Sequence, residues 1–178
     1  MNNAEAINYF RYGFDDSAHG SQQTFRAIFA AMEHPGQLVT IFENPIAPEI
    51  FNSASAATCL TLLSYETPVW TDVDWRNPAI NWLQFGCGSA VVTEPCMANF
   101  AIITKPATMP PLDCFRVGRY EYPEKSTTII VQVDDILPGT ANKYSNLFVD
   151  NTAQLDLKGV PNKFWNQWQQ LSLSLIHI

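Results

Sequence analysis

The spacing of apolar residues changes along the chain, and each spacing predicts an element. Between residues 21 and 34 large apolar side chains recur every three or four positions, the period of an α-helix: Phe25, Ile28, Phe29 and Met32. Ser21 can cap such a helix, and Pro35 with Gly36 would end it. We therefore expect an amphipathic helix over 21–34 that buries this apolar stripe.

Runs rich in β-branched and aromatic residues predict strands at 38–42, 69–71, 90–93, 99–104 and 126–133. The run 126–133 has few polar residues on either face, which is typical of a strand covered on both sides. We expect it in the middle of the sheet. Residues 134–144 have the composition of a loop, and 147–149 with 154–157 suit a hairpin of edge strands.

Further helices are predicted at 53–64, at 77–85 before Gly86, and in a short piece at 112–116. A last helix opens at Pro161 and has an apolar stripe of Phe164, Trp165, Trp168 and Leu171. Helices and strands that alternate in this way favour an α/β layered fold over an all-β barrel. We expect one domain that spans residues 1–178.

Composition narrows the class of protein. The chain has 178 residues, of which 47% are apolar and 15% charged, so it can form a sizeable core. Its net charge of −7 gives it no electrostatic attraction to nucleic acid or an anionic membrane. No apolar run reaches the roughly 20 residues of a membrane span, and no basic and apolar leader opens the chain. We expect a cytoplasmic protein without nucleic-acid or membrane partners.

Residue chemistry indicates no catalytic centre. The cysteines are scattered, without a Cys-x-x-Cys pair or paired histidines, which predicts reduced thiols and no metal site: Cys59, Cys87, Cys96 and Cys114. Gly86-Cys87-Gly88 lacks the rest of a nucleotide-binding fingerprint and suits a helix-ending turn. The lysines lie in polar settings unsuited to a Schiff base. We expect no catalytic residue and no cofactor.

Two polar features are open to a functional interpretation. Arg26 flanks the stripe of helix 21–34, although a solvated or locally paired arginine is the commoner case. Glu124 and the pair Asp134-Asp135 bracket the strand 126–133, and α/β folds bind ligands in crevices at strand ends. Acids at such positions are also ordinary solvated turn residues.

Short motifs spread over most of the chain resemble the PhnH family, a subunit of the carbon-phosphorus lyase system of bacteria. They are Gly13-Phe14, Gln23-Thr24-Phe25-Arg26, Pro35-Gly36, Leu60-Thr61-Leu62-Leu63, Thr67-Pro68-Val69-Trp70, Trp82-Leu83, Gly118, Pro123-Glu124, Ser126-Thr127-Thr128, Gly159-Val160-Pro161 and Phe164-Trp165 with Trp168. Each motif is weak alone, but their shared order and spacing make the resemblance specific.

The resemblance implies a three-layer α/β sandwich with a mixed central sheet, similar to the large domain of pyridoxal-phosphate-dependent transferases but without that cofactor. It also implies a homodimer and a core complex with PhnG, PhnI and PhnJ type subunits. This system of transferase and lyase steps processes organic phosphonates. The family supports formation of ribose 1-methylphosphonate 5-triphosphate from ATP and a phosphonate. The candidate ligand- or partner-facing residues are Gln23, Arg26, Glu124 and Thr128.

The chain departs from the family pattern in places. The family has Arg-Phe-His where this chain has Gln84-Phe85-Gly86, so an anion pocket is not expected in that turn. Asp150-Asn151-Thr152-Ala153 replaces a glycine-rich turn of the late hairpin. The last eight residues, 171–178, replace a family strand, which predicts a truncated C-terminus, an unpaired sheet edge and poor solubility.

The leading hypothesis is a subunit that supports the phosphonate-processing complex without a catalytic motif of its own. One alternative is a stand-alone enzyme or binding protein for a phosphorylated small molecule, held through Arg26 and Glu124. A second alternative is a stand-alone oligomeric α/β protein unrelated to phosphonates.

Overall fold

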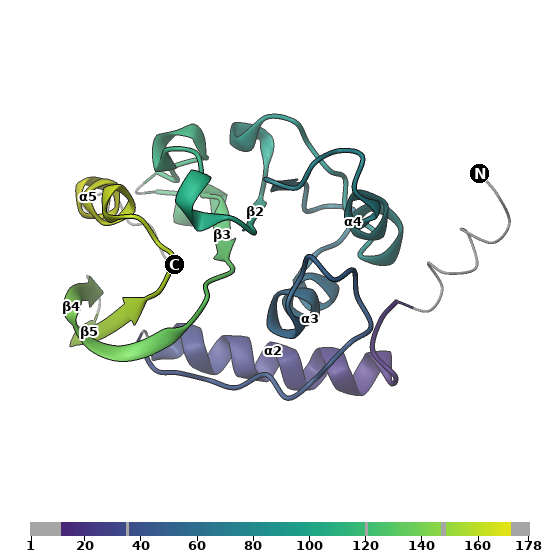
Figure 1. The fold of residues 1–178 in the computed structure, drawn as a ribbon, viewed down its shortest axis with the longest axis horizontal. Coiled ribbons are helices and arrows are strands. Elements are labelled where there is room, and N and C mark those ends of the chain that lie inside the picture. Colours follow the sequence, from purple (N-terminus) through teal and green to yellow (C-terminus); the bar gives the residue numbers. More distant parts are fainter. Residues whose placement is uncertain (1–11, 35, 120, 147–148, 172–178) are drawn as a thin grey trace, which may run out of the picture.

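The computed structural model describes residues 12–34, 36–119, 121–146 and 149–171. It shows helices arranged around a small parallel sheet, with a separate two-stranded hairpin (Figure 1). The helices are α2 (Ser17–Glu33), α3 (Ser53–Leu62), α4 (Pro78–Asn81) and α5 (Asn162–Leu171). The strands are β1 (Val69–Thr71), β2 (Phe100–Ile103), β3 (Thr128–Val131), β4 (Ile136–Asn146) and β5 (Val149–Leu157). The α/β class is therefore confirmed.

The main sheet is parallel throughout its described strands, in the order β1-β2-β3. Trp70 pairs with Ala101, which pairs with Ile129 on the other side. The expectation of a mixed sheet is thus wrong for these strands. Among the described strands, only β4 and β5 pair in antiparallel fashion, and they form a separate sheet. The segment 90–93 contributes only a bridge between Val69 and Val91.

The central strand of the described sheet is β2. Ala101, Ile102 and Ile103 are fully buried, whereas β3 pairs on one side only and its residues are exposed or partly buried. The prediction that 126–133 lies mid-sheet is therefore wrong for the described strands. A run of β-branched residues indicates that a segment prefers an extended backbone. It does not indicate whether the strand lies in the middle or at the edge of the sheet.

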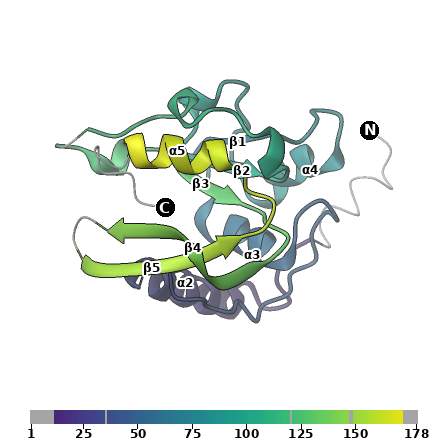
Figure 2. The same cartoon turned by 60° about the vertical axis from the view of Figure 1, so that its left-hand side comes forward.

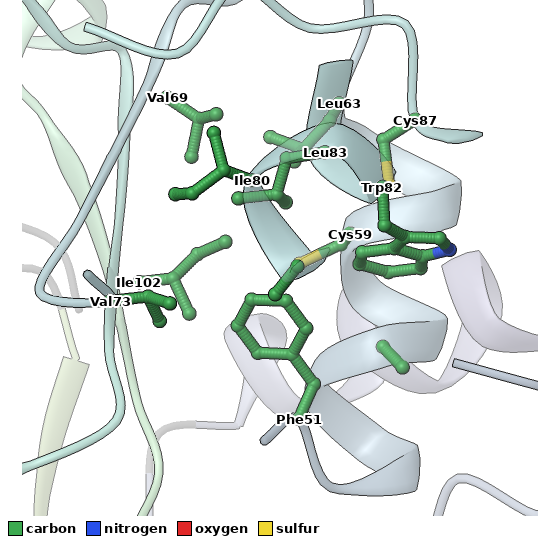
Figure 3. Close-up of a cluster of buried hydrophobic side chains, with 12 residues drawn as sticks. Phe51, Cys59, Leu63, Val69, Val73, Ile80, Trp82, Leu83, Cys87 and Ile102 are labelled. Atoms are coloured by element: carbon green, nitrogen blue, oxygen red, sulfur yellow. The ribbon is translucent and has the colours of Figure 1, made fainter. Parts of the chain in front are cut away.

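Successive side chains of β2 enter two different clusters of buried residues. Ile102 packs with the cluster that contains Phe51, Cys59 and Trp82, shown in Figure 3, whereas Ala101 and Ile103 pack with Phe115 and Phe164. Because neighbouring side chains of a strand point to opposite faces, both faces of the sheet are covered. Residues of α3 and α4 belong to the first cluster, and residues of α5 belong to the second.

The predicted hairpin exists, but it begins earlier than expected. Residues expected to form a loop over 134–144 instead supply most of β4, and Ile136 pairs with Leu157 of β5. Of the expected strand 147–149, residues 147 and 148 lie outside the described residues, and the residues 150–153 expected at the turn lie in β5. Figure 2 shows the hairpin on the side of the molecule that also carries α5.

Helix ends follow the polar residues that precede them. Asn52 caps α3 through its side chain, which accepts a hydrogen bond of 2.7 Å from the Ser55 N–H. Asn77 caps α4 in the same way, and a π-helical turn at Trp82–Gly86 continues that helix. The predicted helices at 53–64 and 77–85 are confirmed, and α5 begins directly after Pro161.

In the described part of the chain, no helix combines the length and hydropathy needed to cross a membrane. The expected truncation at the C-terminus concerns residues 171–178, of which 172–178 lie outside the described residues.

Candidate partner face and groove of helix α2

Helix α2 begins four residues earlier than its apolar period indicates. The Asp16 carboxylate accepts hydrogen bonds from the N–H groups of Ala18 and His19 at 3.1 and 3.0 Å. Asp16 therefore takes the capping role expected of Ser21, and the helix starts at Ser17. The extra turn brings His19 into the helix, in line with the candidate residues Gln23 and Arg26.

Of the apolar stripe predicted on α2, Ile28 is partly buried but Phe25, Phe29 and Met32 face outward, so the prediction that the stripe is buried is wrong for these three residues. Phe25, Phe29 and Met32 are 54%, 59% and 60% exposed, whereas the buried residues of the helix are Gly20 and Thr24. Gly20 lies under the ring of Phe14, where an added Cβ would come within 2.6 Å of it, and α2 runs beside α3, as Figure 1 shows. We call Phe25, Phe29 and Met32 the α2 stripe.

The segment after the helix also exposes apolar side chains. The segment after α2 runs back beside it (Figure 1), and its Leu38 and Phe42 are 51% and 90% exposed. The predicted strand at 38–42 is not formed. The rings of Phe25 and Phe29 stack with their centroids 6.4 Å apart. Exposed apolar side chains gathered along one side of a helix, as in the α2 stripe, mark a surface for a partner.

A groove of about 410 Å³ lies between α2 and the segment 40–43. Its helical wall includes His19, Gln23 and Arg26, and its other wall is formed by 40–43, with Phe42 and Glu43 among the lining residues. Thr24 also lines it, and within the described structure the buried Thr24 hydroxyl has no hydrogen-bond partner. The groove therefore combines a cation, a carboxylate, amide and hydroxyl groups, and an aromatic ring.

The structure brings two of the four candidate residues together and leaves the other two elsewhere. Gln23 and Arg26 share the groove, but Glu124 and Thr128 do not line it. Glu124 lies in a short 3-10 helix, Pro123–Lys125, and Thr128 opens β3. They therefore lie at the amino end of β3, whereas parallel α/β sheets bind ligands at the carboxyl ends of their strands.

Sequence reasoning missed three polar residues of the groove. His19 could have been found, because it lies four residues before Gln23 and seven before Arg26, which places all three along one side of a helix. Thr40 and Glu43 gave no such signal, because their place opposite α2 depends on how the chain folds back after the helix.

The four cysteines are free, and two of them are buried. Burial raises the pKa of the Cys59 thiol to about 12 and also raises the pKa of Cys87, so neither forms a reactive thiolate near neutral pH. Cys96 and Cys114 are exposed. Among the described residues, no group of three or more His, Cys, Asp or Glu side chains could hold a metal ion.

These features define the chain as an α/β protein with a parallel sheet covered on both faces and an outward apolar helix stripe beside a polar groove. The family model of the bacterial phosphonate metabolism protein (PhnH) matches residues 12–174, and the chain belongs to this family. The resemblance found in the sequence motifs is thereby confirmed.

A curated relative supports the same assignment. The alpha-D-ribose 1-methylphosphonate 5-triphosphate synthase subunit PhnH of Rhizobium meliloti is 30% identical to this chain over 156 residues. The aligned region covers 87% of this chain and 78% of the relative.

Proposed function

We propose that the chain is a subunit of a complex that makes ribose 1-methylphosphonate 5-triphosphate in the breakdown of organic phosphonates. Membership of the PhnH family and the name of the Rhizobium meliloti relative, a synthase subunit, support this role. The structural observation that carries the proposal is the α2 stripe, because a subunit needs a surface that is covered only after assembly.

The α2 stripe has the properties of a helix that docks on a partner. Its three side chains are spaced at i, i+4 and i+7, the anchor pattern with which helices enter apolar grooves. Each buried square ångström of apolar surface contributes about 25 cal/mol, so covering two phenylalanines and a methionine favours association strongly.

The finer features of the proposal follow the family resemblance. We propose a cytoplasmic homodimer that assembles with PhnG, PhnI and PhnJ type subunits, with the phosphonate chemistry carried out by the assembly. We also propose a three-layer domain over the whole chain with the topology of the large domain of pyridoxal-phosphate-dependent transferases, without the cofactor. Coverage of the sheet on both faces supports the layered arrangement.

Native mass spectrometry of the chain co-expressed with candidate partner subunits from its own locus tests the proposal. The expected result is a stable assembly that contains paired copies of this chain. Phe29→Glu, which places a charge at the centre of the α2 stripe, should remove the chain from the assembly. Phe85→Glu is the matched control, because Phe85 is 69% exposed and lies in the turn after α4.

The two parts of the proposal fail in different ways. If the unmodified chain forms no assembly with the partner subunits, the complex role is wrong. If the assembly forms and retains Phe29→Glu as well as it retains Phe85→Glu, the complex role stands and the α2 stripe is not its contact.

A further inference from the structure

We propose that residues 38–42, in the segment that runs back beside α2, pair as an antiparallel strand with the same residues of a second copy of this chain. The inference rests on the homodimer that forms part of the proposed function, and it names the contact that joins the two copies. It is argued from the extension of the segment, its unpaired backbone and the order of its side chains.

The segment is held nearly straight along the whole length of α2 (Figure 1). At one end the Gln37 N–H donates to the His34 carbonyl oxygen at 3.0 Å, where the helix ends. At the other end Gly13 and Ile46 exchange two hydrogen bonds of 2.9 Å, just before the helix begins. Helix α2 has 17 residues and is therefore about 25 Å long. The chain from 37 to 46 must cover that length at about 2.8 Å per residue, which is close to the rise of a β-strand.

The backbone of this segment forms no hydrogen bond in the part of the chain that the structure describes. None of the N–H and C=O groups from residue 38 to residue 43 has a partner there. Residues 38–42 also contain no proline and no charged side chain, the features with which proteins usually block an open strand edge. Figure 1 shows the segment at the outer boundary of the molecule. It is therefore open to pairing with a strand of another chain.

The order of the side chains fits a second copy of the same segment. In an antiparallel pair centred on Thr40, this residue lies opposite itself, and the exposed Phe42 lies opposite the exposed Leu38 of the second copy. An aromatic ring opposite an apolar side chain, and two opposite threonines, stabilise a strand pair. The same arrangement places Glu43 opposite Gln37, whose amide can donate to the carboxylate. A parallel pair would instead bring the two Glu43 carboxylates together, so antiparallel pairing is favoured.

This contact is separate from the α2 stripe. The segment lies across the groove from Gln23 and Arg26. Gln23 and Phe25 are two residues apart, a rotation of about 200° around the helix, so the groove and the stripe lie on different sides of α2. A chain that pairs with a second copy therefore keeps its stripe available for another subunit.

The mass of the full chain in solution tests the proposal, measured by light scattering and sedimentation over a range of concentrations. The expected result is a reversible dimer of twice the 20.0 kDa of the chain. Hydrogen–deuterium exchange of the dimer should be slow at alternate amides between residues 38 and 43, because every second residue of a strand pairs with a given neighbour.

Substitutions at Thr40 test the register, because this residue lies opposite itself in the proposed pair. Thr40→Glu and Thr40→Lys should each weaken the dimer by about fivefold or more, since like charges would meet. A mixture of the two variants should form a heterodimer about as stable as the unmodified dimer, because opposite charges then meet. Phe29→Glu in the α2 stripe and Phe85→Glu in the turn after α4 are the controls and should leave the dimer unchanged. Circular dichroism checks that each variant is folded.

The outcomes separate this contact from the rest of the proposed function. A chain that stays monomeric overturns the strand pair and the homodimer, whereas assembly with partner subunits is measured separately by co-expression. Slow exchange at 38–43 only in that assembly would mean that a strand of another protein, and not a second copy, occupies the segment. If the variants at Thr40 leave the dimer unchanged, or if weakened variants do not recover when mixed, the homodimer stands and pairing about Thr40 is wrong.

Discussion

The Asp72 carboxylate accepts hydrogen bonds from both the backbone N–H and the hydroxyl of Thr104, each at 2.8 Å. Its second oxygen accepts a further bond of 2.8 Å from the Lys105 N–H. Asp72 directly follows β1, and Thr104 directly follows β2. The Asp72 side chain therefore links the carboxyl ends of these two strands, and both of its oxygens accept hydrogen bonds from within the protein.

Asp72→Ala should lower the free energy of unfolding by about 2–3 kcal/mol, because two backbone donors and a hydroxyl lose their acceptor. Asp72→Asn keeps one oxygen for Thr104 and should cost about half as much. Urea denaturation measures both changes. Glu66→Ala, at an exposed turn position, is the control and should stay within about 0.5 kcal/mol of the unmodified chain. An Asp72→Ala variant as stable as this control would show that water replaces the lost acceptor.

A buried and an exposed phenylalanine should respond differently to truncation. Phe51 is 5% exposed and lies with its ring centroid 5.4 Å from that of Trp82 (Figure 3), so Phe51→Ala should cost about 3–5 kcal/mol. Phe29→Ala should cost less than about 1 kcal/mol, because the ring is exposed and alanine favours a helix. Urea unfolding of the chain alone, at low protein concentration, makes the comparison. Similar losses would mean that the α2 stripe is covered within the monomer.

The sequence predicted most helices well because the signals for helices are local. Asn52 and Asn77 cap α3 and α4, and the apolar spacing after Pro161 identifies α5. These signals depend on neighbours within about one turn, so they survive any tertiary arrangement.

The wrong predictions concern which part of the molecule packs or pairs with a given helix or segment. The period of Phe25, Phe29 and Met32 correctly identified an apolar face, but a period cannot tell a protein's own core from a partner's surface. The segment 38–42 has strand-forming residues, but no described strand pairs with it, so it forms no strand itself.

The same limit applies to the candidate site: its residues on helix α2 could be predicted from the sequence, and those across the groove could not. Arg26 was found because it flanks the stripe of the helix with the clearest pattern, and Gln23 was found through the family motif that it shares with Arg26. Glu43 was not found, because its position opposite them depends on a reversal of the chain that no local motif encodes.

Gly118 is predicted to resist substitution for steric reasons. A Cβ atom there would lie 2.7 Å from the Pro123 carbonyl oxygen, and paired hydrogen bonds of 3.3 and 3.0 Å between Arg119 and Tyr122 hold the backbone in place. Gly118→Ala should therefore cost about 1–3 kcal/mol in urea unfolding.

Gly88 provides the comparison for Gly118. It has open space around it and a φ of +70°, so alanine there meets backbone strain and no clash. Asparagine tolerates this conformation better than alanine, so Gly88→Asn should recover stability relative to Gly88→Ala. Gly118→Asn should be no better than Gly118→Ala. A recovery at Gly118 would contradict the steric explanation.

The buried thiols should make the protein less stable at alkaline pH. Desolvation raises the pKa of Cys59 from 9.0 to about 12 in the folded protein, and Cys87 shifts in the same direction. Below pH 9 both states keep these protons, so the full stability is present. As pH rises from 9 toward 12 the unfolded chain releases thiol protons that the folded chain retains, and the free energy of unfolding falls.

Urea unfolding at a series of pH values from 7 to 10.5 measures this loss. Tyrosine and lysine also titrate in this range, so the decisive quantity is the difference between variants. Cys59→Ala should be less stable at pH 7 because it leaves a cavity, but its stability should fall less steeply above pH 9. Cys96→Ala, at an exposed thiol, should keep the slope of the unmodified chain. If Cys59→Ala and Cys96→Ala lose stability in parallel with the unmodified chain, ionisation of Cys59 does not contribute to the alkaline transition.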